Sequence, residues 1–254
     1  MIFSSSSSST FKENMSEESY SLDKLRSTLI RLEDTIIFAL IERAQFALNP
    51  CIYQKGALEF QGATGEKSFL DPDEYAFTSP LPEPILPPLQ FDEFLYPNGI
   101  NINNKIMDIY IKDILSVICK KEDDMNYGSS ATKDIEALQA LSKRIHFGKF
   151  IAESKFRSNP SEYIKLALAE DREKIDELLT NKKVEEQVLE RLRRKALVYG
   201  QTLDEEQEGT SKHLRIPVEL VVDLYKRWVI PLTKEVEVDY LIIRGKAAAA
   251  AVSK

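Results

Sequence analysis

The stretch SKRIHFGKFIAESKF, from Ser142 to Phe156, decides the fold and carries the first indication of a function. It belongs to a longer run, 131–157, in which apolar residues recur at steps of three and four, as on an amphipathic helix. On one such helix, Arg144 and Lys155 lie within roughly 20° of the same face and about 16 Å apart. Two long cationic side chains at that spacing can hold a small ligand with two negative groups. Spacing alone equally fits a solvated basic face, which is the commoner arrangement.

The rest of the sequence continues the helical pattern. The same periodicity predicts helices at 22–46, from Asn103 to about 118, at 161–168, 171–179 and 183–199, and from Pro217 onward with an interruption at Pro231. No convincing strand pattern occurs, so we expect an all-α fold with long core helices. Residues 49–102 show little periodicity and contain many prolines, which predicts extended chain over a surface. We expect a disordered Ser-rich tail at 1–21, one helical domain at 22–244 and a low-complexity tail at 245–254.

Composition narrows the classes of function. The chain has 254 residues, of which 43% are apolar and 30% charged, as in a soluble globular protein. Its formal net charge of −7 argues against nucleic acid as the main partner, and no apolar run approaches the roughly 20 residues that span a bilayer. With only two histidines and two widely separated cysteines, we expect no metal site, no cofactor and a reducing compartment.

The N-terminal segment bears on location. It lacks the apolar region of a secretory signal. Plastid transit peptides are Ser-rich too, but they usually contain arginine, and the first arginine of this chain is Arg26. We therefore expect a cytoplasmic protein, with the plastid as the alternative.

The extended segment QALSKRIHFGKFIAESKF resembles the helix that carries the active-site cations in eukaryotic chorismate mutases, the all-helical type of yeast and plants. Further segments resemble the family in the same order. They are LRSTLIRLEDTIIFALIERAQF (Leu25 to Phe46), NYGSSATKD (Asn126 to Asp134), VEEQVLERLRRKALVYG (Val184 to Gly200) and PLTKEVEVDYL (Pro231 to Leu241). The resemblance covers residues 22–70 and 73–243, and blocks in a shared order are more specific than one short motif.

The resemblance implies a homodimeric enzyme that converts chorismate to prephenate in phenylalanine and tyrosine biosynthesis. This Claisen rearrangement has one substrate and needs no nucleophile, metal or redox cofactor. The protein must hold a flexible dianion in its reactive conformation and stabilise the negative charge that develops on the ether oxygen. Residues that match the family's catalytic positions are Arg26, Arg144, Lys155, Asn181, Glu185, Thr233 and Glu237.

In family terms, Arg26 and Arg144 hold the two carboxylates, and Lys155 donates to the ether oxygen. Glu237 meets the same oxygen, which requires a protonated carboxyl and hence a raised pKa. Glu185 accepts a hydrogen bond from the substrate hydroxyl, and the remaining two residues, Asn181 and Thr233, support the ligand carboxylate and neighbouring side chains.

From the residues alone, plainer readings stay open for four of these positions. Arg26 is also an ordinary exposed helix residue, and Asn181 stands where a helix N-cap is expected. Thr233 is also a first-turn residue after Pro231, and Glu237 belongs to an acidic surface run.

Regulation is where the chain departs from the family. There, an aromatic amino acid binds at the dimer interface, between a loop that matches Asn126, Gly128, Ser129 and Thr132 and a pair of adjacent arginines. In this chain Ser68 to Asp71 runs directly into Pro72 to Tyr75, and the helix with the paired arginines is missing. We expect weak or absent inhibition by tyrosine, weak activation by tryptophan and a less secure dimer. The alternative is a catalytically weakened variant that acts as an interaction or regulatory subunit.

Overall fold

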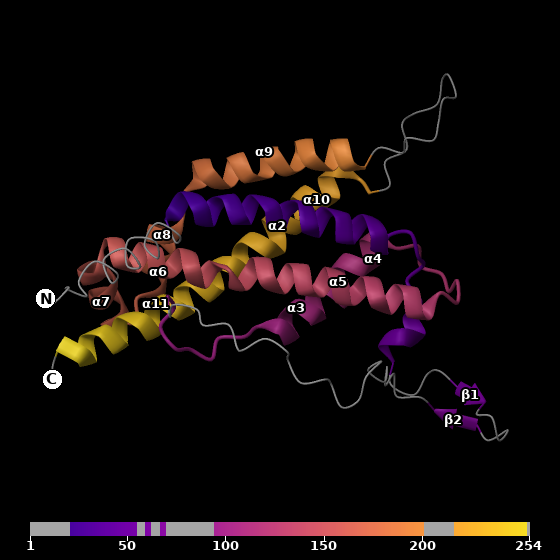
Figure 1. Cartoon of the computed structure of the whole chain (residues 1–254), viewed down its shortest axis with the longest axis horizontal. Coiled ribbons are helices and arrows are strands. Elements are labelled where there is room, and N and C mark those ends of the chain that lie inside the picture. Colours follow the sequence, from indigo (N-terminus) through magenta and orange to yellow (C-terminus); the bar gives the residue numbers. More distant parts are fainter. Residues whose placement is uncertain (1–20, 55–58, 62–66, 70–93, 201–215, 253–254) are drawn as a thin grey trace, which may run out of the picture.

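The computed structural model describes residues 21–54, 59–61, 67–69, 94–200 and 216–252 (Figure 1). In chain order the elements are α2 (Leu22–Arg43), the 3₁₀ turn η1 (Pro50–Tyr53), β1 (Glu59–Gln61), β2 (Lys67–Phe69), α3 (Asn103–Ile109), the π-helical turn η2 (Tyr110–Ile114), α4 (Leu115–Ile118), α5 (Tyr127–His146), α6 (Gly148–Ser158), α7 (Pro160–Leu168), α8 (Arg172–Leu179), α9 (Lys182–Tyr199), α10 (Val218–Leu224), the π-helical turn η3 (Tyr225–Val229) and α11 (Ile230–Val252). The expected all-α class is confirmed.

The long helices lie side by side along the length of the molecule (Figure 1). Helix α2 packs on α5, α9 packs on both α2 and α10, and α11 packs on α6, α7 and α8. The expected helix at 131–157 is divided by Phe147 into α5 and α6, which continue in nearly the same direction (Figure 1). Arg144 therefore lies in the last turn of α5 and Lys155 in the last turn of α6.

The C-terminal helix differs from expectation in two ways. Pro231 does not break it, because the π-helical turn Tyr225–Val229 precedes the proline and the chain is helical from Val218 to Val252. Such turns take up an extra residue inside a helix and are frequent at functional sites. Where a tail was expected at 245–254, α11 continues to Val252, and Gly245 packs closely against Ala167 of α7.

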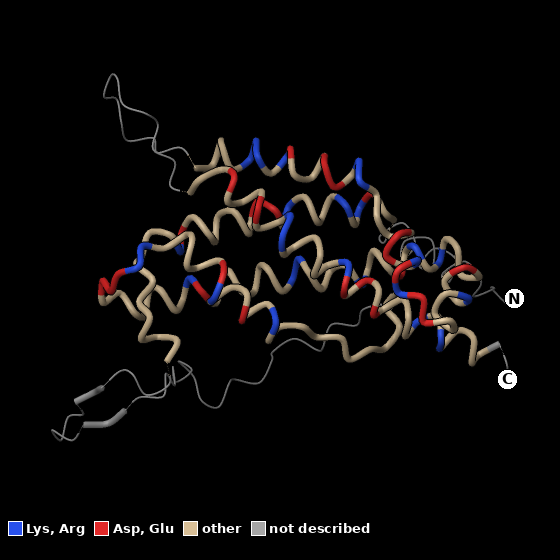
Figure 2. Tube along the Cα trace, turned by 180° about the vertical axis from the view of Figure 1, so that it is seen from behind, with Lys and Arg blue, Asp and Glu red and all other residues tan. Residues whose placement is uncertain are grey.

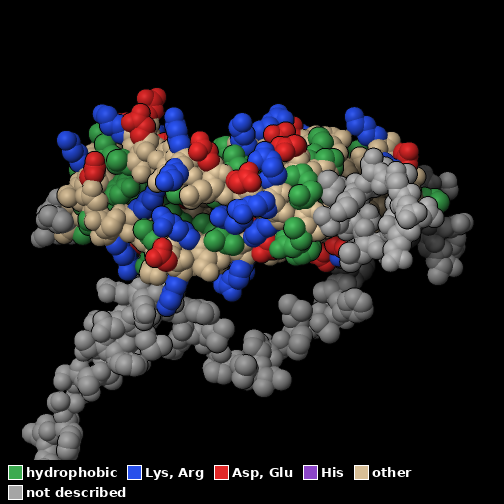
Figure 3. All heavy atoms as spheres, turned by 90° about the horizontal axis from the view of Figure 1, so that it is seen from above, with side chains coloured by type: hydrophobic (Ala, Val, Ile, Leu, Met, Phe, Trp, Pro, Cys, Tyr) green, Lys and Arg blue, Asp and Glu red, His purple; other side chains and the backbone are tan. Residues whose placement is uncertain are grey.

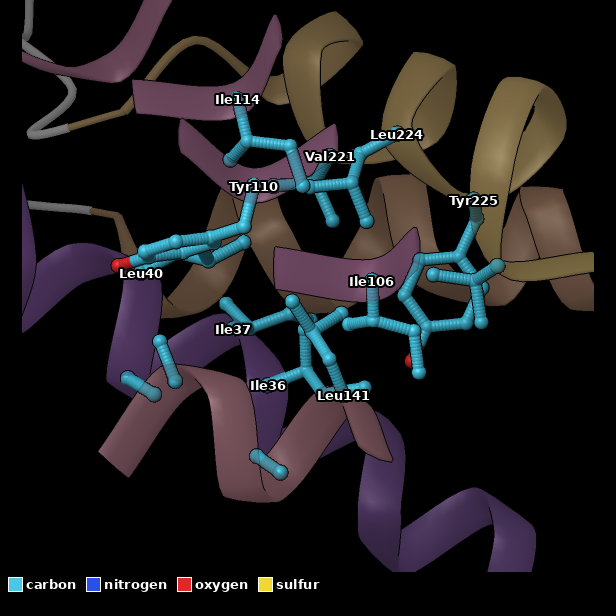
Figure 4. Packing of buried hydrophobic residues seen from close by; sticks show 14 of the residues in the cluster. Ile36, Ile37, Leu40, Ile106, Tyr110, Ile114, Leu141, Val221, Leu224 and Tyr225 are labelled. Carbon is cyan, nitrogen blue, oxygen red and sulfur yellow. The ribbon is translucent and has the colours of Figure 1, made fainter. Parts of the chain in front are cut away.

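Two apolar clusters hold the helices together. The larger joins α2, α5, α9, α10 and the turns η2 and η3; its members include Ile36, Ile37, Leu40, Ile106, Tyr110, Ile114, Leu141, Val221, Leu224 and Tyr225 (Figure 4). The smaller joins α6, α7, α8 and α11 through Ala152, Phe156, Tyr163, Ile175, Tyr240 and Leu241. The residues that match the catalytic positions lie on helices that these two clusters fix in place.

Buried ion pairs set the relative positions of three of these helices. At the end of α2, Arg43 donates from Nε to Asp134 Oδ1 of α5 over 2.6 Å, and Arg43 is fully buried. Near the middle of α2, buried Glu33 accepts two hydrogen bonds from Arg191 of α9, at 2.6 and 2.8 Å. Removing one partner of such a buried pair typically costs about 3–5 kcal/mol.

Residues 94–102 form the extended chain that the sequence predicted, and they lie over α6 and α11. Lys149 Nζ donates to Ile100 O over 2.7 Å, and Tyr96 N donates to the Tyr240 hydroxyl over 2.8 Å. This segment is therefore tied to both helices by side-chain hydrogen bonds.

The described strands are short. β1 and β2 pair antiparallel, with Glu59 opposite Phe69 and Gln61 opposite Lys67. Ser68 and Phe69, where the resemblance implies the start of a helix, lie in β2. The junction of Asp71 with Pro72, at which the helix is inferred to be missing, lies outside the described residues, as do 1–20 and 201–215.

Charged residues of both signs are distributed along the helices (Figure 2). On the face that carries α9, lysines and arginines alternate with aspartates and glutamates (Figure 3). Within the described ranges, no helix is long and apolar enough to cross a membrane. The same ranges hold no group of three or more side chains that could bind a metal ion.

Candidate active site

Arg144 and Thr233 form the buried centre of the site. Arg144 Nη1 donates to Thr233 Oγ1 over 3.2 Å, and Thr233 Oγ1 donates to the Val229 carbonyl over 2.6 Å. The Arg144 guanidinium lies 5.9 Å from the centre of the Tyr225 ring. Its Nε is buried, and no partner for it exists among the described residues. A buried guanidinium with an unsatisfied donor is costly unless a ligand completes it.

Glu237 lies one helical turn after Thr233 on α11 and is also buried. Burial raises the pKa of its carboxyl to about 7, against the opposing charges of Lys155, Arg144 and Lys234. This side chain therefore keeps its proton to near-neutral pH, in agreement with the requirement derived from the resemblance. The exposed acidic run that the sequence also allowed is not what the structure shows.

Lys155 faces Glu237 from α6. Burial lowers the pKa of its ammonium group, Glu237 raises it, and the charges of Arg26 and Lys234 lower it further. Its Nζ donates to the carbonyl of Leu179, the last residue of α8, over 2.9 Å. Of its three donors, this bond uses one, so Lys155 can still donate to a ligand.

Lys234, which was not among the predicted site residues, connects α11 to the start of α9. Its Nζ lies 2.7 Å from Glu185 Oε1 and donates to Thr180 Oγ1 over 2.7 Å. The signal was available, because Lys234 is a cation directly after Thr233 and three residues before Glu237. Through Lys234 the structure brings Glu185 into the group.

Asn181 and Arg26 lie at the exposed edge of the site. Asn181 is the N-cap of α9, and its Oδ1 accepts from Val184 N over 3.2 Å, which confirms the expected capping role. Arg26 lies on the first turns of α2, is half-exposed and contacts Asp23 at 3.4 Å. Its charge is among those that lower the pKa of Lys155, so the two cations lie near enough to interact.

The four residues of the candidate effector loop lie together, away from this site. Asn126, Gly128, Ser129 and Thr132 are exposed at the start of α5, and Thr132 Oγ1 donates to Gly128 O over 2.9 Å. The loop is held by Asp124, which accepts from the backbone N–H of Asn126 over 2.9 Å. Arg144 lies 18 residues after Asn126, or about 27 Å along α5.

The chain is similar to known proteins over most of its length. A family model described as chorismate mutase type II matches residues 126–238. A chorismate mutase of Trichoderma parareesei is 46% identical over 255 residues, which cover 90% of this chain and 95% of the relative. The chloroplastic chorismate mutase 1 of Petunia hybrida is 42% identical, covering 89% of this chain and 76% of the relative.

Solved structures give the same result. The Aro7p chorismate mutase of Candida albicans, in complex with L-Trp, has a TM-score of 0.75 at 37% identity and covers 90% of this chain and 93% of its own. AtCM1 with tyrosine bound in its allosteric site has a TM-score of 0.71 at 39% identity. The match covers 89% of this chain and 97% of the AtCM1 chain. With this level of identity over nearly its whole length, the chain belongs to the chorismate mutase type II family.

Proposed function

We propose that this chain catalyses the Claisen rearrangement of chorismate to prephenate at the site around Arg144 and Glu237. The observation that carries the proposal is the buried Glu237 carboxyl, with a pKa of about 7, facing the cations Lys155 and Arg144. An electron-rich ether oxygen placed between Glu237 and Lys155 meets a neutral O–H donor and an ammonium donor. Both hydrogen bonds strengthen as the C–O bond breaks and negative charge gathers on that oxygen.

The substrate carboxylates are assigned to the arginines. Arg144 is buried and held by Thr233, and its Nε has no partner in the part of the chain that the structure describes. A planar guanidinium binds a carboxylate through two parallel hydrogen bonds. Arg26, half-exposed at the edge of the site, is suited to the second carboxylate as the substrate enters. Holding both ends of the dianion favours the compact conformer in which the reacting carbons meet.

The substrate hydroxyl is assigned to Glu185. In the structure this carboxylate contacts Lys234, so binding requires Glu185 to accept a second hydrogen bond or Lys234 to turn away. When Lys234 turns away from Glu185 and toward the ligand, its ammonium group joins Arg144 and Arg26 as a third positive charge near the substrate carboxylates. We also propose Lys234 as a ligand-binding residue, because it contacts Glu185 and lies on the same helix as Thr233 and Glu237.

The proposal is tested by following the loss of chorismate absorbance after adding the purified full-length protein, with prephenate identified as the product. We expect turnover without added metal or cofactor, and unchanged turnover after treatment with a chelator. A protein that is helical by circular dichroism yet does not accelerate the reaction would contradict the proposal.

A prediction for Asn181 separates capping from ligand binding. Asn181→Ala should lower the free energy of unfolding by about 1 kcal/mol, because α9 loses its N-cap, whereas Asn181→Ser should preserve the cap. If the Asn181 amide also supports the ligand, both variants should have a raised KM for chorismate. The serine variant should show this raised KM without a lower free energy of unfolding. Urea unfolding and initial rates measure the two effects. A serine variant with unchanged KM would leave Asn181 with capping alone.

We further propose that the exposed loop residues Asn126, Gly128, Ser129 and Thr132 form half of an aromatic amino-acid site. Relatives have L-Trp or tyrosine bound, and for AtCM1 that site is described as allosteric. Without the paired arginines, the amino-acid carboxylate lacks a charged partner. Such a loss costs about 2–5 kcal/mol, or roughly 30-fold or more in affinity.

Initial rates with tyrosine or tryptophan are therefore expected to change little over concentrations that saturate related enzymes, with L-alanine as the control amino acid. Calorimetric titration checks binding directly. Strong inhibition by tyrosine would show that another group supplies the missing charge.

The homodimer also stays a prediction, for which light scattering during size-exclusion chromatography is the measurement.

The single domain at 22–244 and the cytoplasmic location likewise stay predictions. Relatives at comparable identity include chloroplastic enzymes, so the plastid remains the alternative location. Fluorescent tagging at the C-terminus distinguishes the two compartments.

A further inference from the structure

Gly148 is the first residue of α6, and it is buried against α11. A Cβ atom at this position would lie 2.9 Å from Thr233 Cγ2, 3.0 Å from Glu237 Cγ and 3.1 Å from the Thr233 carbonyl oxygen. The backbone of Gly148 is not in the left-handed region, so its conformation suits any residue. The glycine is required here by the close approach of two helices, not by its own backbone angles.

The contact is central to the proposed site. Gly148 stands one turn after Arg144 and two turns before Lys155 on the run formed by α5 and α6. On α11 it touches Thr233 and Glu237, which are one turn apart. This close contact fixes the distance between two pairs of side chains. One pair is Arg144 and Lys155, and the other is Thr233 and Glu237.

We propose that Gly148 is a positioning residue for the rearrangement, which sets the distance of Thr233 and Glu237 from Arg144 and Lys155. This inference rests on the proposed function. A methyl group at residue 148 must push Thr233 and Glu237 away from α6. The Arg144–Thr233 hydrogen bond, already 3.2 Å long, would lengthen further, and the carboxyl of Glu237 would move from its place opposite Lys155. A misplacement of about 1 Å can cost roughly 10²-fold in rate.

Other glycines of the chain provide matched controls. A Cβ atom at Gly245 would lie 2.4 Å from Ala167 Cβ and 3.0 Å from the Tyr163 carbonyl oxygen, so it too is a close contact of α11. Gly245 lies eight residues beyond Glu237, or about 12 Å along the helix. A Cβ atom at Gly99 would have no described atom within 4 Å, and this residue lies outside the helices.

The experiment compares Gly148→Ala, Gly245→Ala and Gly99→Ala in the full-length protein, with kcat, KM and thermal stability measured for each. We expect Gly148→Ala to lose tenfold or more in kcat/KM at a temperature where it is folded, with most of the loss in kcat. Gly245→Ala should melt at a lower temperature but keep kcat/KM within about twofold while folded. Gly99→Ala should match the parent in both measurements.

A second variant tests the contact itself. Thr233→Ser removes the Cγ2 methyl that a new Cβ at residue 148 would meet, and it keeps the hydroxyl that Arg144 contacts. In a double-mutant cycle, the Gly148→Ala loss should be smaller in the Thr233→Ser background than in the parent. If Gly148→Ala folds, the double variant should have a higher kcat/KM than Gly148→Ala alone. If Gly148→Ala does not fold, Thr233→Ser should restore both folding and activity.

Several outcomes would overturn the inference. The first is a folded Gly148→Ala enzyme with kcat/KM within twofold of the parent. The second is a decrease in kcat/KM no larger than that of folded Gly245→Ala. The third is a decrease in kcat/KM that Thr233→Ser does not reduce. Failure of the proposed function is a different result, because then the unsubstituted protein itself would not convert chorismate.

Discussion

Arg144→Ala is expected to lower kcat/KM for chorismate by roughly 30-fold to several thousand-fold. The side chain is buried, its Nη1 is fixed by Thr233, and its Nε is left without a partner among the described residues. Losing a charged, hydrogen-bonded contact to a substrate carboxylate costs about 2–5 kcal/mol. The loss should fall on both KM and kcat, because the same contact binds the dianion and keeps it in the reactive conformation.

Two comparisons make this result specific. Arg194→Ala is the matched control and should not alter the rate. Its side chain is 72% exposed on α9, and within the described ranges its one ion pair is with Glu190, at 4.0 Å. Arg144→Lys keeps the positive charge but not the planar fork, so it should recover only part of the lost activity. Circular dichroism must show that Arg144→Ala is folded. A folded Arg144→Ala enzyme with nearly normal kcat/KM would remove Arg144 from the mechanism.

The sequence predicted most of the fold because helical periodicity is a local property. The expected helices at 22–46, 161–168, 171–179 and 183–199 agree with α2, α7, α8 and α9 to within a few residues. The break at Phe147 and the π-helical turns at 110–114 and 225–229 were not predicted. They change the direction or register of a helix without changing which residues are apolar, so periodicity does not report them.

In the site, too, some features could be predicted from the sequence and others could not. Resemblance picked out the residues that the structure gathers around Arg144 and Glu237, but not the groups that hold them there. Lys234 lies close to two of these residues in sequence, but its pairing with Glu185 and Thr180 appears only in the folded chain. The need for glycine at residue 148 arises only when α6 meets α11, and the pKa of Glu237 depends on burial that neither helix produces alone. Each of these properties comes from tertiary packing.

The activity of the enzyme is expected to fall as the pH rises through about 7, because Glu237 must be protonated. Burial raises the pKa of this carboxyl from its ordinary value near 4.5 to about 7. Below that pH the neutral carboxyl donates to the ether oxygen; above it, the carboxylate repels the charge that develops there. On the alkaline side kcat/KM should therefore decrease about tenfold per pH unit. Stability should follow the same direction, because the folded state binds this proton more tightly than the unfolded chain does.

The charged groups around Glu237 allow the fall to be assigned. Lys155, Arg144 and Lys234 lower its pKa, and Asp176 raises it. Bound substrate carboxylates neutralise part of the positive charge, so the midpoint for kcat should lie at higher pH than the midpoint for kcat/KM. Lys155 also titrates with a lowered pKa, and loss of its proton would reduce activity in the same direction.

Glu237→Gln separates the two groups. Its amide is a donor at every pH, so its profile should lose the fall near pH 7 and keep only the decrease at higher pH that belongs to Lys155. The substitution removes the titration but keeps the shape of the side chain, and the variant should exceed the parent enzyme at mildly alkaline pH. If the parent profile were flat from acid to mildly alkaline pH, or if Glu237→Gln kept the same midpoint, the proton at Glu237 would not take part in the reaction.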